Sequence, residues 1–547
     1  MFFGNDEKTI KEAVKAILDN KLVAIPTETV YGLAANALSE KAVNLIYKAK
    51  GRPNDNPLII HLSEISDVEK YAEFPETAKL LAKKFWPGPL TMILKKKRCI
   101  PEIVTAGLDT VAVRIPDSKI TRDIIRMTGV PLAAPSANLS GKPSPTKASH
   151  VYDDYNGKFF DNGEEIIAGI IDGGECEKGI ESTIILISDK SPVLLRPGVI
   201  TVEKLREFLP DIKIAKAVLS EMEKGEKPIS PGMAHRHYSP SSPTYGIRGN
   251  TKNIAAYINA QSVAEKIAVM CFDDDIKLFS DDVIKISYGN RSSPESLAKN
   301  IFSVLRELDK KNVDKIFVEI LEGRGVYLAV YNRLIRACGF SVIDADIPPV
   351  SICITGPSGA GKTSVCEELK KSGFFHIDAD KIAAEILPKL KNKLCEEFGH
   401  EIITSDGTID RKKLARIAFS SKEKTKLLNK ITHPAITKKI LNIASEKIKY
   451  KIPVLIDGAA IFEAGLNKLT DYTISVIADS GLRKKRILLR DNISDEMIDR
   501  RFSSQYDESF YIKNSDFYVI NDGNEKLESL KNKIIAFIKK RKGIKYD

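Results

Sequence analysis

A glycine-rich run with a lysine and a threonine lies between an apolar segment, Val350–Thr355, and an amphipathic stretch, Ser364–Lys371. Glycines in such a run let backbone amides turn toward phosphate oxygens, the lysine neutralises phosphate charge, and the threonine hydroxyl can bind magnesium. Strand, loop and helix follow one another in the order that a phosphate-binding loop requires. We therefore predict an ATP site formed by Gly356, Gly359, Ala360, Gly361, Lys362, Thr363 and Ser364.

Acidic residues end two further predicted strands in the same part of the chain. The segment Phe375–Asp380 ends with Asp378 and Asp380, and Pro453–Asp457 ends with Asp457. The carboxyl edge of a doubly wound sheet is where such folds bind ligands, and carboxylates there suit magnesium or its water shell. Aspartate is also favoured as a helix N-cap, so each of the two neighbouring aspartates can take one of these roles.

Arginines follow at helical spacing. Arg483, Arg486 and Arg490 fall on one face of the helix predicted there, as a lid that clamps phosphates would need. A run of charges is more often a solvated helix face, and the sequence leaves that alternative open.

Cations and hydroxyl groups also gather in the first part of the chain. Lys50, Arg52 and Arg114 occur in loops or strands, and Ser136 and Asn138 follow as a second polar group. Triphosphates and carboxylates both bind to such sets of side chains. Surface ion pairs and an ordinary turn explain the same residues equally well on spacing alone, and His61, in an apolar strand, would by itself be a buried core histidine.

Length and composition place these residues in an α/β protein. At 547 residues, with 43% hydrophobic and 29% charged residues, the chain predicts about three globular domains. Strand-like runs alternate with amphipathic stretches, which favours α/β layers.

Apolar runs are too short to cross a membrane, the N-terminus is unlike a secretory signal, and a cytoplasmic protein is expected. Seven scattered cysteines without a Cys-x-x-Cys pair suit reduced thiols, not disulfides or structural zinc. The net charge of +11 suits nucleotide substrates as well as nucleic acids.

The C-terminal block resembles the dephospho-coenzyme A kinases. The resemblance rests on the glycine-rich loop, Asp378-Ala-Asp380, His433-Pro434, Phe462-Glu-Ala-Gly465, Arg486 with Arg490-Asp491, Gln505 and Asp516–Asn521. It implies that Asp380 takes the proton from the ribose 3′-hydroxyl, that Lys362 and Arg490 are catalytic, and that Arg486 and Asn521 help bind ATP. Magnesium ligands would be Thr363 and Asp457. The family's Pro-Leu-Leu run is replaced by Gly458-Ala-Ala-Ile461, which is expected to loosen the acceptor pocket.

The N-terminal block resembles the long, two-domain form of the threonylcarbamoyl-AMP synthases (YrdC-like). Matching motifs include Pro26–Leu33, Lys50–Pro53, Trp86–Thr91, Ala134–Asn138, Glu181–Thr183, Arg196–Gly198 and Asn332–Leu334. The resemblance implies that Lys50 and Arg52 are catalytic. ATP would be bound by Arg52, Asn56, Thr110, Ser136, Asn138, Ser144, Arg196 and Tyr238, and threonine by Thr29, His61, Arg114, Ala134 and Ser182.

These resemblances imply a bifunctional enzyme. One half would condense L-threonine, bicarbonate and ATP into threonylcarbamoyl-adenylate for a modification of tRNA at adenosine 37, and the other would phosphorylate dephospho-coenzyme A. Magnesium would accompany ATP at both sites. Proteins of the tRNA threonylcarbamoylation pathway are candidate partners, no membrane is involved, and direct binding to nucleic acid is left open.

The expected domains are a YrdC-like twisted mixed sheet with helices (1–228), a linker or lid (229–243), a small Rossmann-like extension (244–345) and a P-loop kinase with a parallel sheet and a helical lid (348–547). The linker is rich in proline, glycine and serine, yet Arg236, His237 and Tyr238 suggest that it folds over the N-terminal cleft. Two alternatives compete with two active enzymes: a nucleic-acid-binding module fused to a kinase, or one active enzyme joined to a partner that serves only as structure or as a binding module.

Overall fold

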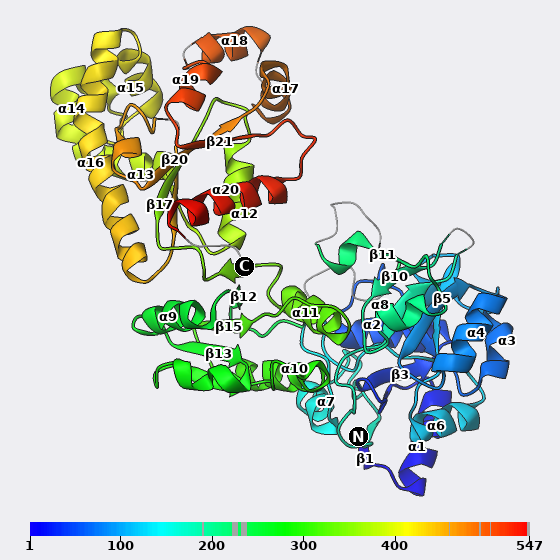
Figure 1. Cartoon of the computed structure of the whole chain (residues 1–547). Coiled ribbons are helices and arrows are strands. Elements are labelled where there is room, and N and C mark those ends of the chain that lie inside the picture. Colours follow the sequence, from blue (N-terminus) through cyan, green and yellow to red (C-terminus); the bar gives the residue numbers. More distant parts are fainter. Residues whose placement is uncertain are drawn as a thin grey trace. The chain divides into compact units, whose positions relative to one another are not determined.

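The computed structural model divides into two compact units (Figure 1). The first comprises Met1–Ile247 and Glu265–Ser341, and the second comprises Arg248–Ala264 and Val342–Asp547. The structure describes residues 1–188, 191–220, 228–230, 238–458, 460–491, 494–503 and 505–543. In the predicted linker, residues 231–237 lie outside the described part, and with them Arg236 and His237 of the proposed lid.

The first unit contains a mixed sheet with the strand order β1-β8-β2-β3-β7-β4-β6-β5-β9-β10-β11. Its strands are β1 (Phe2–Gly4), β2 (Val23–Ile25), β3 (Gly32–Asn36), β4 (Ile59–His61), β5 (Leu90–Lys95), β6 (Thr110–Arg114), β7 (Leu132–Ala133), β8 (Gly169–Ile171), β9 (Thr183–Leu186), β10 (Val193–Arg196) and β11 (Lys213–Ile214). Parallel pairs such as β4 with β6 adjoin antiparallel pairs such as β5 with β6, which confirms the predicted mixed sheet.

Helices cover both faces of this sheet. Side chains alternate between the two faces along each strand, so neighbouring residues of one strand pack against different helices. Val23 and Ile25 pack with helices α1 (Glu7–Leu18) and α6 (Lys119–Thr128). Ala24 packs on the opposite face, with α2 (Glu40–Lys50), α4 (Glu76–Phe85) and α7 (Ala148–Tyr155). The shorter helices are α3 (Val68–Tyr71), α5 (Glu102–Thr105) and α8 (Val202–Arg206).

A smaller parallel sheet follows in the same unit, with β14 (Ile284–Ser287), β13 (Ile267–Cys271), β15 (Lys315–Glu319) and β12 (Thr244–Arg248) as successive neighbours. The sequence pattern predicts a strand at Ile267–Cys271 and an amphipathic helix at Pro294–Asp309, and strand β13 and helix α10 (Pro294–Asp309) have these bounds. The sequence pattern also predicts a helix at Val330–Ala337. Helix α11 (Val326–Ala337) begins earlier, directly after Gly325, which has a positive φ of 63°. Helix α9 (Thr251–Ser262) and strand β16 (Val342–Asp344) lie in segments of the second unit.

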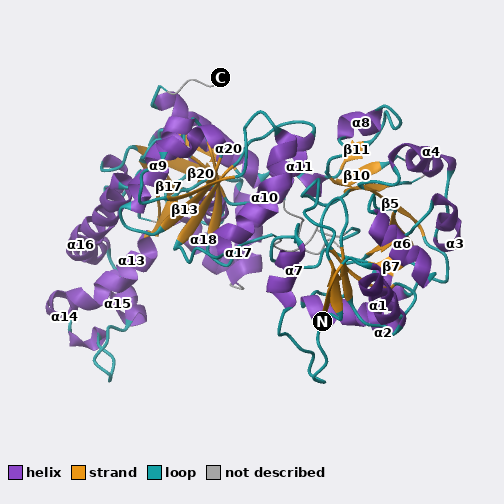
Figure 2. Cartoon of the chain, turned by 90° about the horizontal axis from the view of Figure 1, so that it is seen from below, coloured by secondary structure: helices purple, strands orange, loops and turns teal. Residues whose placement is uncertain are grey.

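The second unit contains a parallel sheet in the order β18-β19-β17-β20-β21. These strands are β17 (Ser351–Thr355), β18 (Phe375–Asp378), β19 (Val454–Asp457), β20 (Tyr472–Ile477) and β21 (Phe517–Ile520). Side chains of α12 (Lys362–Lys371) and α20 (Leu527–Arg541) pack on one face, and those of α13 (Ala379–Ile386) and α16 (Lys422–Lys449) pack on the other. Figure 2 shows helices beside the strands of this sheet. The predicted parallel sheet is confirmed.

The remaining helices of the second unit lie outside these two layers. They are α14 (Lys391–Phe398), α15 (Arg411–Ala418), α17 (Ser480–Asp491), α18 (Asp495–Ser503) and α19 (Glu508–Lys513). Among the described residues, no helix combines the length and apolar character needed to span a membrane. All seven cysteines lie in the described part, and none of them forms a disulfide there.

Candidate active sites

A polar pocket opens in the first unit where several strands end. Strands β4 and β6 are parallel and in register at their last residues, so that His61 lies beside Arg114. Most of the predicted synthase residues come together here: the pocket is lined by Lys50, Arg52, His61, Arg114, Ala134, Ser136, Asn138, Ser182, Arg196 and Tyr238. Glu181 also lines the pocket, and the sequence assigned it no role.

Two cations of this pocket, Lys50 and Arg52, are held by backbone carbonyl groups. The ammonium group of Lys50 donates to the carbonyl oxygens of Ser136 and Asn138, each at 2.5 Å. Arg52 donates to the carbonyl oxygens of Asn56 and Pro57. Burial lowers the pKa of Lys50 well below its usual value and lowers that of Arg52 to about 10. A buried positive charge is stabilised when an anion arrives, so the pocket favours anionic ligands.

Arg196 is the third cation of the pocket. It donates to the carbonyl oxygen and the hydroxyl of Ser182 at 3.0 and 3.1 Å, and the same hydroxyl lies 2.7 Å from that of Thr91. Burial lowers the pKa of Arg196 to about 10. These bonds fix the turn that precedes β9 against the end of β10.

Arg114 is paired with an acid that sequence reasoning missed. Its guanidinium lies 2.7 Å from the carboxylate of Glu28, and both side chains are only 5% exposed. His61 lies next to Arg114, and burial together with this arginine lowers the histidine pKa to about 3. The imidazole is therefore neutral near pH 7, and its Nδ1 is buried without a hydrogen-bond partner among the described residues. This nitrogen is available to a ligand in the pocket.

Glu181 connects the N-terminal part of the first unit, which contains the mixed sheet, to helix α11. Its carboxylate accepts a 2.6 Å hydrogen bond from Ser144 and a 2.8 Å bond from Arg333, which is 0% exposed and lies on α11. Arg333 also donates to the carbonyl oxygen of Pro197. Burial alone would raise the pKa of Glu181, but Arg333 and Arg196 outweigh it and hold this pKa at about 2. Helix α11, which follows the smaller sheet in the sequence, thus supplies a cation that fixes the wall of the pocket.

Four predicted residues do not line the pocket. The hydroxyl of Thr29 is buried against that of Thr27, at 2.7 Å. Asn56 is buried, and its carbonyl group holds Arg52. Thr110 begins β6, and Ser144 reaches the pocket only through Glu181. Their predicted contacts with substrates stay predictions.

The described end of the linker lies at the same pocket. Tyr238 is 5% exposed, has a positive φ of 65°, and packs its ring 5.0 Å from that of Phe302 on α10. The next residue, Ser239, donates its backbone N–H to the carbonyl oxygen of Gly141, which also lines the pocket. Tyr238 therefore occupies the position that the lid hypothesis requires of it, whereas the rest of the lid lies outside the described residues.

The glycine-rich loop of the second unit joins β17 to α12, as predicted. Gly356, Gly359 and Gly361 have φ values of 138°, 81° and 91°, which residues with side chains rarely adopt. Lys362 begins the helix and folds its ammonium group back to the carbonyl oxygen of Gly356 at 2.9 Å. The loop therefore has the shape of a phosphate cradle before any phosphate is bound.

Side chains from α17 and from the end of β21 support this loop. Arg483 donates to the carbonyl oxygen of Ser358 at 2.9 Å. Arg486 donates to the carbonyl oxygen of Asn521 at 3.0 Å, and the Asn521 amide donates to that of Ala360 at 2.9 Å. Arg490, on the same helix, instead pairs with Asp491 at 2.6 Å. Two of the three arginines thus meet the loop, and Arg490 does not.

Asp378 and Asp380 divide the two roles that the sequence allowed. Asp378 is the N-cap of α13 and accepts a 3.0 Å hydrogen bond from the backbone of Lys381. Asp380 makes no such cap and lines a neighbouring cavity. Burial, followed by the charge of Asp378, raises the pKa of Asp380. A carboxylate with a raised pKa is a better proton acceptor, which suits a general base.

The cavity beside Asp380 has a volume of about 270 Å³ and is mostly apolar. Leu387, Leu414, Phe419, Leu428, Ile436, Ala460, Ile461 and Leu466 contribute to its wall, and Arg411 and His433 add polar groups. Ala460 and Ile461 belong to the segment that departs from the family pattern, whereas Ala459 lies outside the described residues. The small side chain of Ala460 therefore faces the cavity, whereas Ile461 is as large as the leucine of the family pattern.

A Gly361→Ala substitution is expected to raise the KM for ATP at the glycine-rich loop by about ten-fold or more, because a strained backbone costs about 1 to 3 kcal/mol. An added Cβ would lie 2.2 Å from the Asn521 amide, at a φ of 91°. Gly465→Ala is the matched control, since its φ is also positive, at 68°, and no atom lies within 4 Å of the added Cβ. Equal KM values for ATP in the two variants would contradict this account of the loop.

Comparisons with known proteins give the following matches. Family models match residues 15–198 (Telomere recombination), 200–339 (Threonylcarbamoyl-AMP synthase, C-terminal domain) and 350–526 (Dephospho-CoA kinase). The chain is 44% identical over 343 residues to a threonylcarbamoyl-AMP synthase of Bacillus subtilis, a match that covers 62% of this chain and 96% of the relative. It is 36% identical over 190 residues to a dephospho-CoA kinase of Fusobacterium nucleatum, a match that covers 34% of this chain and 95% of the relative.

One solved structure resembles the first unit closely. It is the crystal structure of Sua5 from Pyrococcus abyssi complexed with L-threonine, with a TM-score of 0.58 and 41% identity. The match covers 63% of this chain and 99% of that one. In both halves, therefore, the chain covers nearly the whole length of its relatives.

Proposed function

The chain belongs to the threonylcarbamoyl-AMP synthase family in its first part and to the dephospho-CoA kinase family in its last, and we propose that it catalyses both reactions. One reaction joins L-threonine, bicarbonate and ATP into threonylcarbamoyl-adenylate and pyrophosphate. The other transfers the γ-phosphoryl group of ATP to the 3′-hydroxyl of dephospho-coenzyme A. The observation that carries this proposal is the presence of two separate phosphate-binding arrangements, one in each unit.

In the synthase, Arg52, Lys50 and Arg196 would hold the phosphates of ATP. The carboxylate formed from threonine and bicarbonate attacks the α-phosphorus, and pyrophosphate leaves with the bonding electrons. Negative charge grows on the leaving group, so fixed cations stabilise this step. Arg114 and His61 would place the carboxylate and the hydroxyl of threonine, and Ser182 would add a hydroxyl contact. Ser136, Asn138 and Tyr238 would hold the rest of the nucleotide.

In the kinase, Asp380 would accept the proton of the ribose 3′-hydroxyl as this oxygen attacks the γ-phosphorus. Backbone amides of the loop and Lys362 hold the phosphates, and Arg486 with Asn521 fixes the far side of the loop. Catalysis then depends on positioning and on neutralising charge. Arg490, which points to Asp491 in this structure, would have to rotate to act on phosphate.

Magnesium fits the kinase site through Thr363, on the first turn of α12, and Asp457, at the end of β19. Both offer oxygen ligands, which magnesium prefers. When bound with ATP, the ion neutralises phosphate charge. Burial raises the pKa of Asp457, and the positive charge of Lys362 lowers it. Asp457 therefore lies close enough to Lys362 for their charges to interact. Magnesium at the synthase site stays a prediction without assigned ligands.

The apolar cavity beside Asp380 would bind the uncharged part of dephospho-coenzyme A. Its polar groups, Arg411 and His433, can face the charged part of the acceptor. The small side chain of Ala460 leaves this cavity wider than the family's leucine would, so we expect a lowered affinity for the acceptor. Partner proteins in tRNA threonylcarbamoylation and the cytoplasmic location both stay predictions.

The proposal is tested with the purified full-length chain in two assays. One follows threonylcarbamoyl-adenylate from threonine, bicarbonate and ATP, and the other follows coenzyme A from dephospho-coenzyme A and ATP. We expect both products. If one product is missing while the other forms, the half of the chain assigned to the missing product serves as a binding or structural module. The bifunctional proposal then fails.

A further inference from the structure

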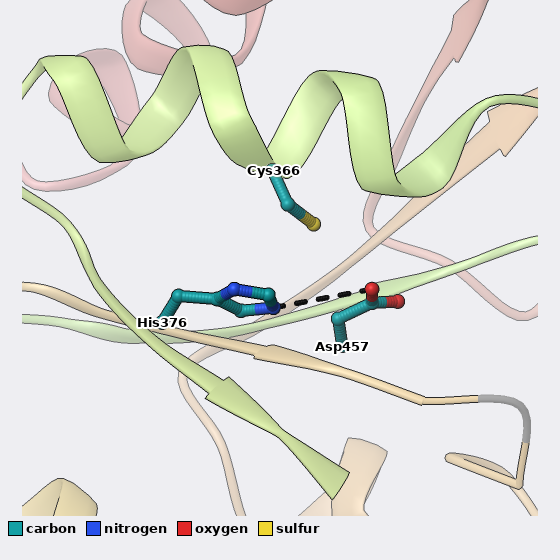
Figure 3. Close-up of side chains that lie close together, drawn as sticks. All are labelled: Cys366, His376 and Asp457. Atoms are coloured by element: carbon teal, nitrogen blue, oxygen red, sulfur yellow. Dashed lines mark ion pairs between the residues drawn. The ribbon is translucent and has the colours of Figure 1, made fainter. Parts of the chain in front are cut away.

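Three metal-ligating side chains of different types lie together beside helix α12, which follows the phosphate-binding loop. They are Cys366 on α12, His376 on β18 and Asp457 at the end of β19 (Figure 3). One ligand atom from each, the sulfur, an imidazole nitrogen and a carboxylate oxygen, lies within 4.8 Å of the other two. The three residues are far apart in the sequence, and Cys366 occurs in no Cys-x-x-Cys pair.

Strand register explains why these side chains meet. In the parallel pair of β18 and β19, His376 is opposite Leu455 and Asp378 is opposite Asp457. Side chains alternate along a strand, so His376 and Asp457 project from one face of the sheet. Leu455 packs with α12 on that face, and Ile377 and Ile456 pack on the other. Cys366, on the buried side of α12, therefore faces both residues.

The chemistry of this set differs from that of a magnesium site. Magnesium prefers oxygen ligands, whereas a thiolate and an imidazole are ligands of zinc and related ions. The Nε2 atom of His376 is buried, lies 3.9 Å from the Asp457 carboxylate and has no hydrogen-bond partner among the described residues. Cys366 is 0% exposed. In a tetrahedral zinc site, ligand atoms are about 3.3 to 3.7 Å apart, so small side-chain movements would close this set around an ion.

We propose that Cys366, His376 and Asp457 bind a zinc-like divalent cation that inhibits the kinase. This proposal rests on the proposed function, because Asp457 is also the carboxylate assigned to magnesium. When the cation binds, the thiol of Cys366 loses its proton to solvent and the sulfur becomes a ligand. Asp457 is then held by the inhibitory ion and no longer serves magnesium with ATP. The synthase site has no part in this cluster, so its activity is not affected.

Binding itself is tested with Co²⁺ on the full chain without an affinity tag. A cobalt–thiolate bond gives a near-ultraviolet charge-transfer band that nitrogen and oxygen ligands do not give. We expect this band in the wild type and in a Cys395→Ala control, which removes another buried cysteine of the second unit. It should be lost in Cys366→Ala and in the more conservative Cys366→Ser. A band of equal strength in either Cys366 variant would overturn the site.

Inhibition is tested with buffered Zn²⁺ in the presence of saturating Mg²⁺ and ATP. The zinc concentration for half-inhibition of the kinase should rise by at least about ten-fold in Cys366→Ala and in His376→Gln, since each variant loses a ligand. Synthase activity of the same samples is the internal control. Equal inhibition of the wild type and both variants would show that zinc acts elsewhere. Absence of kinase activity before zinc is added would contradict the proposed function and leave the cobalt result to decide the site.

Discussion

The Asp380→Asn substitution is expected to lower the kinase turnover number by about 10² to 10⁴-fold, the usual effect of removing a general base. Asparagine has nearly the same shape but cannot accept the proton of the 3′-hydroxyl. Asp380 lines the acceptor cavity and not the glycine-rich loop, so the KM for ATP should change little. Steady-state kinetics with varied ATP at saturating dephospho-coenzyme A measures both quantities.

Asp378→Asn is the matched control for this prediction. Asparagine is as good an N-cap as aspartate, so helix α13 should keep its start and activity should stay near that of the wild type. The base must be ionised, and burial and Asp378 raise the pKa of Asp380. The wild-type turnover number should therefore fall on acidification from a pH above the usual aspartate range. If Asp378→Asn were the slower variant, the assignment of the two roles would be reversed.

The second large effect concerns stability. Arg333→Met is expected to destabilise the first unit by about 3 to 5 kcal/mol, because it leaves the Glu181 carboxylate buried without its nearest cation. Synthase activity should fall at temperatures where the second unit still shows kinase activity. Thermal unfolding followed by the loss of each activity distinguishes the two units.

A second substitution separates the buried charge from the loss of packing. In the Arg333→Met, Glu181→Gln double variant no uncompensated carboxylate remains, and part of the stability should return. The pKa of Glu181 is lowered from 4.5 to about 2 in the folded state, so the ion pair stabilises fully above pH 4.5 and less as the pH falls toward 2. The difference between wild type and Arg333→Met should shrink over that window. A constant difference would assign the effect to packing.

Local patterns predicted much of this fold. The order of strand, glycine-rich loop and helix at 350–371 is a signal confined to neighbouring residues, and the structure has it as β17 and α12. The bounds of β13 and α10 were also predictable, since turn residues and Pro294 mark them. Helix α16 (Lys422–Lys449) was not predicted, because Pro434 lies inside it and proline normally ends a helix.

The sites show the same division between local and distant information. Lys50 and Ser136 could be named from motifs that they share with a family, and they do meet in the pocket. Glu181 and Arg333 are 152 positions apart, and Glu28 and Arg114 are 86 positions apart. Hydrophobic periodicity does not predict contacts between residues so distant in the sequence. Only strand register and helix packing bring them together. The cluster of Cys366, His376 and Asp457 also combines residues from three elements, and the sequence did not predict it for the same reason.

The two active sites of this chain are expected to work independently of one another. This independence is tested by measuring both products with the full-length Lys362→Ala variant. This substitution removes the ammonium group that folds over the glycine-rich loop, and the rate of coenzyme A formation should fall by at least about 10²-fold. Threonylcarbamoyl-adenylate formation should stay within about two-fold of the wild-type rate, since Lys362 lies outside the first unit. Loss of both products from a folded variant, or retention of both, would contradict the claim.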